Sequence, residues 1–388
     1  MEFISTTMTL EARHTSGVYS KRELTISHGQ GALLYDDQGR EYIDCVGGQG
    51  AANLGHAHPQ IANALYHQSQ TLISCPEMFY NQQRADFVAQ LCALAPQGLG
   101  RAFLCNSGTE AVEAALKFAR FATGRRQVIA AMRGFHGRSM GALSATWNKN
   151  YRQPFEPLVP DFSHVPYNNP QKLVEAVNNQ TAAVILEVVQ GEGGVYPGSR
   201  EFLQTAQQVC QQHGAMLIVD EVQTGFGRTG KLFAAAHHNL QPDVLCLGKS
   251  IAGGVPMGAA LIGERLGPLV PGIHGSTFGG NPLACAAGLA ALQIQQQEKL
   301  PERAAVLGTY LLEQLGQLDS PLIREVRGLG LMVGIELKQK VAPYLQALTE
   351  RGVLALPAGM NVIRLLPPLV ISSQQLDQVV AALQEVLS

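Results

Sequence analysis

Residues 216–221 read Met-Leu-Ile-Val-Asp-Glu, and residues 244–249 read Val-Leu-Cys-Leu-Gly-Lys. Each stretch is a short apolar run that ends on charge, as expected for a buried strand of a parallel sheet whose last residue reaches a loop. Lysine resists burial because its ammonium is strongly hydrated, and desolvation lowers its pKa toward the nucleophilic free amine. Lys249 and the acids Asp220 and Glu221 therefore predict chemistry at one edge of such a sheet.

Strand-like and helix-like segments alternate along the middle of the chain. Apolar runs lie at residues 103–105, 127–132 and 182–186, and amphipathic helical patterns lie at residues 109–121 and 202–212. Alternation of this kind predicts βα units around a parallel sheet. We therefore expect an α/β fold.

The two ends of the chain carry a different pattern. Residues 31–44 predict a hairpin that need not belong to the central sheet. Near the other end, a long helical stretch over residues 282–297 leads to mixed strands and helices. We predict a large domain over residues 53–281 and a second, smaller domain that combines residues 1–52 with residues 282–388.

Length and composition limit the classes of function. A chain of 388 residues exceeds what one hydrophobic core usually carries, so about two domains are expected. Apolar residues make up 46% and charged residues 15%, which is typical of a compact folded protein. The net charge of -2 gives no electrostatic reason for binding nucleic acid or an anionic membrane. Small-molecule partners are favoured.

The cysteines and the first residues bear on the compartment. The seven cysteines are odd in number and scattered, which fits a reducing cytoplasm. Residues 1–5 lack a basic region followed by an apolar core, and no apolar stretch approaches the ~20 residues that span a bilayer. We expect a cytoplasmic protein without an export signal or a membrane anchor.

Residues 106–110, Asn-Ser-Gly-Thr-Glu, form a turn that opens a helix after the run at 103–105. The amides at a helix N-terminus point outward and can bind an anion. Ser107 and Glu110 also have the spacing of an ordinary capping box, and taken alone that interpretation is the better one. The anion site gains weight because a Schiff-base lysine and an acid for a ring nitrogen are what pyridoxal-phosphate enzymes require, and that cofactor carries a phosphate.

Residues 133–138, Arg-Gly-Phe-His-Gly-Arg, place an aromatic ring and a guanidinium three positions apart. Phe135 could stack on a planar cofactor, and Arg138 could bind a carboxylate through two parallel hydrogen bonds. Core packing for the ring and a surface position for the charge are about equally good interpretations. His136, like His56 and His58, lacks a third ligand at a recognisable spacing, so we predict no metal site.

Three further loops are rich in glycine, at residues 187–194, 220–230 and 274–282. Glycine allows close approach of the backbone to a ligand, although such turns also occur for purely geometric reasons. The first two loops carry acids at strand ends, and the last offers two hydroxyls. Each is a weak indication when taken alone.

Taken in order, these motifs resemble the class III pyridoxal-phosphate aminotransferases over nearly the full chain. The resemblance is closest to the acetylornithine aminotransferase group, including the acetyl-lysine and carrier-protein-linked enzymes of lysine and arginine biosynthesis. It implies fold type I, with a large domain built on a mostly parallel, seven-stranded type of sheet and a small α+β domain from both chain ends. It also implies a homodimer with a shared active site. Further stretches that carry the resemblance lie at residues 16–19, 42–48, 131–135 and 362–369.

The resemblance also implies roles toward pyridoxal 5′-phosphate. Lys249 would form the Schiff base and afterwards move a proton, and Asp220 would keep the ring nitrogen protonated. The other cofactor-binding positions hold the ring, its phenolic oxygen or its phosphate: Phe135, Val222, Gln223, Ser107, Gly108, Thr109, and Thr277 from the partner subunit.

For the substrates, the resemblance implies that Arg138, helped by Tyr19, holds the distant carboxylate of the amine donor. Arg364 would bind the α-carboxylate of glutamate and would be masked by Glu192 when the other substrate enters. Ser276 is the remaining substrate position.

Two departures from the family pattern concern loops. Val188 replaces a usual proline, and residues 250–252, Ser-Ile-Ala, replace a more common Ala-Leu-Gly. Neither departure removes a reactive group.

The activity implied is transfer of the terminal amine of an N-blocked ornithine or lysine to 2-oxoglutarate, giving a semialdehyde and glutamate. The blocking group stays open between acetyl, succinyl and the glutamate end of an amino-group carrier protein. Alternatives are a succinylornithine, ornithine or 4-aminobutyrate aminotransferase, an aminomutase, and a non-catalytic cofactor-binding regulator. The regulator is disfavoured because every reactive position is filled.

Overall fold

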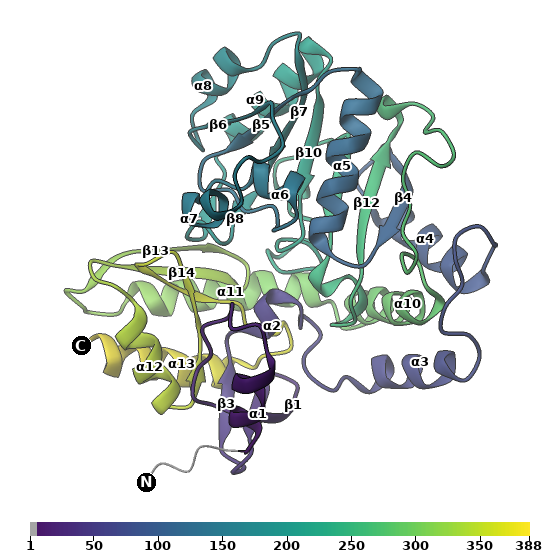
Figure 1. Ribbon diagram of the computed structural model, residues 1–388. Helices are drawn as coiled ribbons and strands as arrows, with labels where there is room; N and C mark the ends of the chain where they lie inside the picture. The colour runs from purple at the N-terminus through teal and green to yellow at the C-terminus, as the bar shows by residue number, and fades with distance from the viewer. Residues whose placement is uncertain (1–5) are drawn as a thin grey trace.

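The computed structural model describes residues 6–388, and within them the largest sheet has seven strands (Figure 1). All of these strands run parallel except β12, which is antiparallel to both of its neighbours. The prediction of an α/β fold with a mostly parallel sheet is thereby confirmed. In sheet order the strands are β4 (Leu99–Cys105), β12 (Gly258–Gly263), β11 (Val244–Leu247), β10 (Met216–Asp220), β7 (Thr181–Leu186), β5 (Gln127–Ala131) and β6 (Phe162–Val165).

Strand β12 was not anticipated from the sequence. It reads Gly-Ala-Ala-Leu-Ile-Gly, and all of its residues are buried. A Cβ at Gly258 would lie 2.3 Å from the carbonyl oxygen of Ser107, so glycine is needed where this strand passes the turn that opens α5 (Gly108–Thr123). Because β12 pairs with β4 on one side and β11 on the other, it brings residues 106–110 beside residues 248–249.

The sheet is covered on both faces, as the alternation of its side chains requires. Met216 and Ile218 of β10 pack in one apolar cluster with α5, and Leu217 and Val219 pack in another with α9 (Arg200–His213). Successive side chains of a strand point to opposite faces, so a strand with no polar residue before its end must be covered twice. This burial places the first charged residue of β10, Asp220, at the edge of the sheet.

The predicted hairpin near the N-terminus forms β2 (Leu33–Asp36) and β3 (Glu41–Asp44), outside the large sheet. Strand β15 (Val353–Leu354), more than 300 residues later, pairs in parallel with β3. β1 (Ile26–Gln30) completes this sheet. Segments from both chain regions thus share one sheet, and α1 and α13 lie in the same part of Figure 1.

A third sheet of four strands lies in the C-terminal region. In sheet order it contains β13 (Ile323–Leu329), β14 (Met332–Leu337), β17 (Val362–Leu365) and β16 (Leu356–Ala358). The domain boundaries after residues 52 and 281 stay a prediction. The part of the first segment before Thr6, and the expected lack of an export signal at residues 1–5, lie outside the described residues.

The remaining elements connect or cover these sheets. In the part of the chain from residue 6 onward, no helix is long and apolar enough to cross a membrane. The short strands β8 (Val189–Gln190) and β9 (Tyr196–Pro197) form a hairpin of their own. The other helices are α1 (Thr6–His14), α2 (Gly47–Gly50), α3 (Pro59–Ser69), α4 (Gln82–Leu94), α6 (Met140–Ala145), α7 (Lys149–Arg152), α8 (Pro170–Ala176), α10 (Pro282–Gln297), α11 (Leu300–Gly316), α12 (Ala342–Glu350) and α13 (Ser373–Leu387), with 3₁₀ turns η1 (Gln153–Phe155), η2 (Ala234–His237), η3 (Lys249–Ala252) and η4 (Glu264–Leu266).

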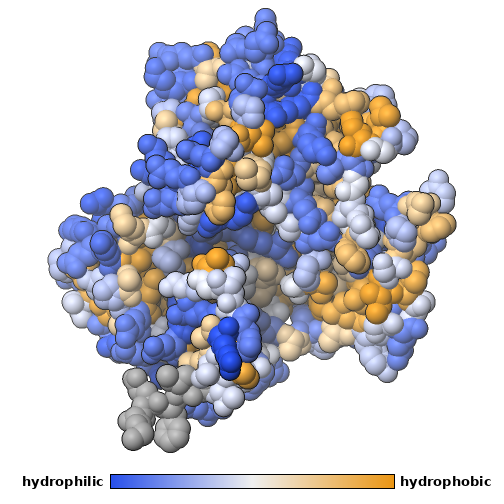
Figure 2. Space-filling view, viewed as in Figure 1, coloured by the Kyte–Doolittle hydropathy of each residue, from blue (hydrophilic) through white to orange (hydrophobic). Residues whose placement is uncertain are grey.

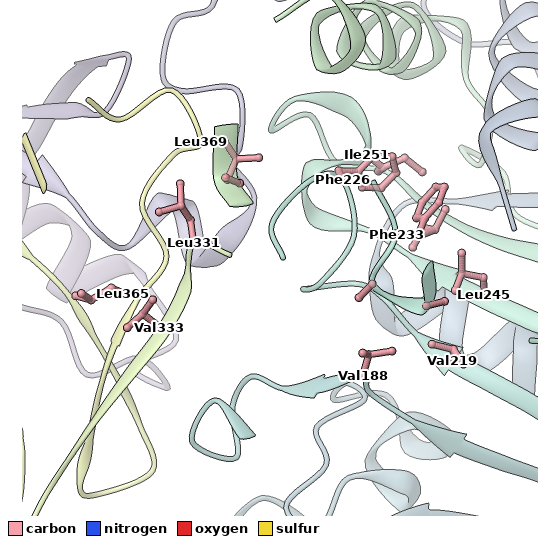
Figure 3. Packing of buried hydrophobic residues seen from close by; sticks show 14 of the residues in the cluster. Val188, Val219, Phe226, Phe233, Leu245, Ile251, Leu331, Val333, Leu365 and Leu369 are labelled. Atoms are coloured by element: carbon pink, nitrogen blue, oxygen red, sulfur yellow. The ribbon is translucent and has the colours of Figure 1, made fainter. Parts of the chain in front are cut away.

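Apolar packing extends from the large sheet to the C-terminal region in one continuous cluster (Figure 3). Val219 and Leu245 of the large sheet belong to it, as do Leu331, Val333 and Leu365 of the C-terminal region. Because interiors are densely packed, a shared cluster holds its two sides in a defined relative position. Functional groups from both sides can therefore meet in one site.

Candidate active site

Lys249 lies directly after β11 and opens the turn η3. Its backbone adopts a φ of 47°, in the left-handed region that few non-glycine residues occupy. Its side chain is half-buried and hydrogen-bonds to no residue of the described chain. Burial lowers the pKa of Lys249 to about 8, against the partly compensating negative charge of Glu192. Roughly a tenth of this amine is therefore neutral at pH 7, a far larger share than in a lysine of ordinary pKa.

Asp220 ends the neighbouring strand β10, where it pairs in register with Cys246 of β11. The carboxylate is buried; its Oδ2 lies 2.7 Å from Nδ1 of His136, and its Oδ1 accepts a bond of 3.0 Å from the Val222 amide. Burial by itself would lower the pKa of His136, but the hydrogen bond and charge of Asp220 outweigh it and raise this pKa. The raised pKa favours the protonated imidazole of His136, which places a positive charge beside the Asp220 carboxylate.

The contact between His136 and Asp220 was not anticipated from the sequence, which gave this loop histidine no role. Its proximity to Asp220 depends on the packing of β5 and β10 in one sheet and cannot be deduced from spacing. The available signal was its position between Phe135 and Arg138, inside a segment already suspected of binding a ligand. A carboxylate has about four lone-pair directions, so Asp220 can still accept a hydrogen bond from an N–H group of a ligand.

The N-terminus of α5 lies close to the ends of β10 and β11, and glycines allow this close approach. A Cβ at Gly108 would lie 2.5 Å from Cγ1 of Val222, and a Cβ at Gly248 would lie 3.0 Å from Cα of Gly108. The predicted phosphate-binding turn thus adjoins both Asp220 and Lys249. An amine, a buried carboxylate and a helix N-terminus that glycines bring close together fit pyridoxal 5′-phosphate.

Ser107 caps α5, because its Oγ accepts a bond of 3.3 Å from the amide of Glu110. The capping box itself is incomplete, since the Glu110 carboxylate accepts from the amide of Asn106 at 2.7 Å. The Ser107 hydroxyl keeps its own proton for an anion. Thr109 faces another loop, with its Oγ1 2.7 Å from Oγ of Ser139.

Glu187 connects two of the predicted loops. Its Oε1 accepts a bond of 3.0 Å from the amide of Phe135, and its Oε2 accepts one of 3.1 Å from the amide of Gly191. Burial raises the pKa of Glu187 to about 7, although the neighbouring His136 opposes the shift. No role for Glu187 was expected from the sequence, although it directly follows an apolar run, as Asp220 does.

Arg364, Glu192 and Gln223 come together beside Lys249. Nη1 of Arg364 donates to Oε1 of Glu192 at 2.6 Å and to Oε1 of Gln223 at 3.1 Å. Arg364 is buried, and its Nε has no hydrogen-bond partner in the described chain. Burial opposes ionisation of Glu192, but the charge of Arg364 outweighs it and lowers the pKa of this carboxyl. The ion pair proposed from the resemblance is present in the structure.

A cavity of about 530 Å³ extends outward from Phe135 and Glu192. Figure 2 shows the molecular surface hollowed between the part that contains the large sheet and the part below it. The guanidinium of Arg138 lies 3.5 Å from the ring centroid of Tyr151, which lines the cavity, and 5.6 Å from that of Phe135. The cavity lies between residues 133–151 on one side and residues 357–360 on the other.

The structure does not bring every predicted residue to this cluster. Tyr19 and Thr277 are exposed, and within residues 6–388 no hydrogen bond, ion pair or ring contact joins either of them to Lys249. Ser276 lies beside the turn before α5, where its Oγ accepts a bond of 3.1 Å from Nδ2 of Asn106. Across residues 6–388, no group of three or more His, Cys, Asp or Glu side chains is arranged to hold a metal ion.

Comparisons with known proteins agree with this geometry. Residues 16–387 match the family model described as Aminotransferase class-III. The chain is 52% identical to the [LysW]-aminoadipate semialdehyde transaminase of Deinococcus radiodurans, over 97% of the chain and 89% of that protein. It is 43% identical to the acetylornithine aminotransferase of Methanothermobacter thermautotrophicus, over 98% and 97%. The crystal structure of ornithine aminotransferase from Toxoplasma gondii superposes with a TM-score of 0.93 at 33% identity, covering 98% of this chain and 94% of that one.

The lowered pKa of Lys249 predicts unusual reactivity at moderate pH. In protein freed of cofactor, acetylation of Lys249 by acetic anhydride should rise with pH and reach half its maximal rate near pH 8, because only the neutral amine reacts. Peptide mass spectrometry across pH 6 to 11 measures this rate. A midpoint near the ordinary value of 10.5 would contradict the burial argument.

Proposed function

The chain belongs to the class III aminotransferases, and we propose that it transfers the terminal amino group of an N-blocked ornithine or lysine to 2-oxoglutarate. It is a pyridoxal-phosphate-dependent enzyme, as are the members of this family. The observation that carries the substrate proposal is the Arg364–Glu192 ion pair, held at 2.6 Å beside the reactive lysine. The products are the corresponding semialdehyde and glutamate, as in arginine or lysine biosynthesis.

Bound pyridoxal phosphate supplies a ring that withdraws electrons from the substrate carbon that bears the transferred amine. Asp220, backed by His136 at 2.7 Å, holds a proton on the ring nitrogen. Val222 and Phe135 would hold the ring between them, and Ser107, Gly108 and Thr109 would offer the phosphate a helix N-terminus. Gln223 would donate to the phenolic oxygen.

Lys249 would hold the cofactor covalently and would move the proton. Its Nζ would accept the proton from the substrate carbon, because a pKa of about 8 leaves roughly a tenth of the amine neutral at pH 7, far more than in an ordinary lysine. No hydrogen bond from the described chain holds this amine in one place, so it can move between the atoms that exchange the proton.

Two different substrates use the same site. A substrate with a terminal amine presents no carboxylate near the reacting carbon, and Glu192 then stays paired with Arg364. Glutamate presents an α-carboxylate, which displaces Glu192 from Arg364. In either state the buried guanidinium keeps an anionic partner, which avoids the cost of several kcal/mol for an unpaired buried charge.

The distant end of the amine donor reaches the cavity of about 530 Å³. Arg138 binds its carboxylate, with the guanidinium already oriented by stacking on Tyr151 at 3.5 Å. Two kinds of blocked donor are supported by relatives: a 52% identical one is named for a [LysW]-linked substrate, and a 43% identical one for acetylornithine. We include a small amino-group carrier protein among the partners.

We also propose a cytoplasmic homodimer. Five of the seven cysteines are buried as free thiols, as suits a reducing compartment. Arg84 holds two exposed segments together, since it donates to the carbonyl of Phe79 at 3.0 Å and to that of Gly280 at 2.8 Å. Phe79 and Phe278 are exposed on this edge beside Thr277, and a second copy of the chain would cover them. Thr277 would then reach the partner's phosphate site.

The proposed function predicts the outcome of a donor screen. Stopped-flow absorbance of the half-reaction should show fast amine transfer with acetylornithine, acetyl-lysine, succinylornithine or a carrier-linked lysine, and slow transfer with free ornithine and 4-aminobutyrate. Lys249→Ala should lose turnover by several orders of magnitude, because it removes both the attachment and the proton carrier. Reaction only with unblocked donors would reject the substrate proposal.

Arg138→Ala should raise KM for the blocked donor by roughly 10 to 100-fold, because a charge-assisted bidentate contact worth about 1.5–3 kcal/mol is lost. KM for glutamate should change less. Steady-state kinetics with both donors measure the difference. Arg126→Ala is the matched control, since Arg126 is exposed like Arg138 but lacks the contact with Tyr151 that places Arg138 beside the cavity. Equal KM values in Arg138→Ala and the control would remove Arg138 from the site.

Glu192→Gln should lower the ratio of kcat/KM for the blocked donor to kcat/KM for glutamate by roughly tenfold. The neutral amide no longer neutralises Arg364, so the site favours the carboxylate of glutamate. The two half-reactions measured separately give the ratio, and the exposed Glu201→Gln is the control. A ratio unchanged from the parent enzyme would reject the masking role.

A further inference from the structure

Glu192 lies in the turn of the hairpin formed by β8 and β9, which has little internal support. Its strands contribute only the pairs Val189 with Pro197 and Gln190 with Tyr196. Inside the turn, the Gly194 amide donates to the Gly191 carbonyl over 3.4 Å, which is long for a hydrogen bond. A hairpin this short is marginal by itself, so other parts of the fold must define the position of Glu192.

Arg327, on β13, supplies that support from the C-terminal region. Its Nε donates to the carbonyl of Gly194 at 3.0 Å and to that of Val195 at 3.1 Å, and its Nη2 donates to Gly194 at 2.7 Å. Nη1 donates to Glu325 and Glu336, each at 2.7 Å. The planar guanidinium thus spans from two carboxylates to the backbone of the hairpin, which a lysine ammonium is unable to do.

Tyr196 of the hairpin completes this contact. Its ring stacks on the guanidinium of Arg327, with a distance of 3.8 Å from centroid to Cζ, and its hydroxyl donates to Glu336 at 3.0 Å. Burial opposes ionisation of Glu336, but its hydrogen bonds from Arg327 and Tyr196 lower the pKa of this carboxyl. The charge that orients Arg327 is therefore present across the neutral pH range.

The register of the C-terminal sheet relates this contact to the ion pair. Arg327 lies opposite Gly334, and Gly334 lies opposite Arg364. Residues directly opposite each other point to the same face of a sheet, so these three form a row across it. Arg327 holds the carbonyls at 194 and 195, and Arg364 holds Glu192.

Gly334, in the middle of the row, leaves room for Val195. A Cβ at Gly334 would lie 2.9 Å from Cβ of Val195, which is fully buried. Val195 has a φ of 56°, an unusual backbone for a β-branched residue, and such conformations persist only where the surroundings enforce them. Arg327 and Gly334 together hold the hairpin in this strained form.

We propose that Arg327 is a positioning residue for substrate discrimination: by fixing the hairpin at Gly194 and Val195, it sets the Glu192 carboxylate in register with Arg364. Arg327 contacts neither substrate nor cofactor and acts through Glu192. This inference rests on the proposed masking of Arg364 by Glu192. Arg327 would return the Glu192 carboxylate to the same position beside Arg364 after each turnover.

The test compares Arg327→Met with Arg324→Met in the full-length holoenzyme. Arg324 also donates to Glu336, at 3.1 Å, but it is exposed and no described contact joins it to the hairpin, so it is a matched control. Arg327→Met should lower the blocked-donor to glutamate ratio of kcat/KM by roughly tenfold, because a displaced Glu192 leaves Arg364 open. Arg324→Met should leave the ratio unchanged.

A double variant separates positioning from general damage to the fold. In the Glu192→Gln background, Arg327→Met should change the ratio by less than about twofold, because the mask is already gone. An equal effect in both backgrounds, or no effect of Arg327→Met where Glu192→Gln alone shifts the ratio, would overturn the inference and leave the proposed function standing. No effect of Glu192→Gln itself would reject the masking proposal and this inference with it.

Gly334→Ala provides the same test if Arg327→Met does not fold. Its added methyl group displaces Val195 without removing a charge or a hydrogen-bond donor. The ratio of kcat/KM for the blocked donor to that for glutamate should fall, as in Arg327→Met. In the Glu192→Gln background, Gly334→Ala should leave this ratio nearly unchanged. If Gly334→Ala folds and keeps the kcat/KM ratio of the parent enzyme, the row of Arg327, Gly334 and Arg364 has no role in positioning Glu192.

Discussion

The buried guanidinium of Arg228 joins the parts of the molecule that build the site. Its Nη1 donates to the carbonyls of Leu331 at 2.8 Å and Pro367 at 2.6 Å, and its Nη2 donates to Oδ1 of Asn53 at 2.7 Å. These partners belong to three segments far apart in the sequence. Because a buried donor or acceptor left unpaired costs about 1–3 kcal/mol, any shift between these segments would be penalised several times over. Gly330 has no space for a Cβ beside this arginine, since one would lie 2.7 Å from the Arg228 carbonyl oxygen.

The relative position of these segments matters because different segments supply the residues of the active site. Lys249 and Asp220 end strands of the large sheet, whereas Arg364 lies on β17 of the C-terminal sheet. Glu192, in the turn of the hairpin formed by β8 and β9, pairs with Arg364 at 2.6 Å. A charge pair of this length tolerates little displacement, so the packing of the two regions sets the strength of the pair.

The sequence predicted those site residues that a local pattern marks. Lys249 and Asp220 are charged residues at the ends of apolar runs, and burial of those runs leaves them nowhere to lie except the edge of the sheet. Strand β12 escaped prediction because it is short, apolar and antiparallel. The partnership of His136 with Asp220 and the support of the hairpin by Arg327 depend on register between strands distant in sequence, which no local pattern encodes.

The paired charges also explain how Lys249 keeps a useful pKa while two substrates alternate. The pKa of its amine is lowered to about 8 mainly by burial, and this balance already includes a raising contribution from Glu192 and a lowering one from Arg364. In the proposed exchange, the carboxylate of glutamate would replace the one that Glu192 withdraws, and the charge near Arg364 would be conserved. The amine would then have nearly the same electrostatic surroundings in both half-reactions. A neutral residue in place of Arg364 would forfeit this balance, because the incoming carboxylate would add a negative charge that nothing offsets and would raise the pKa of Lys249 only in the glutamate half-reaction.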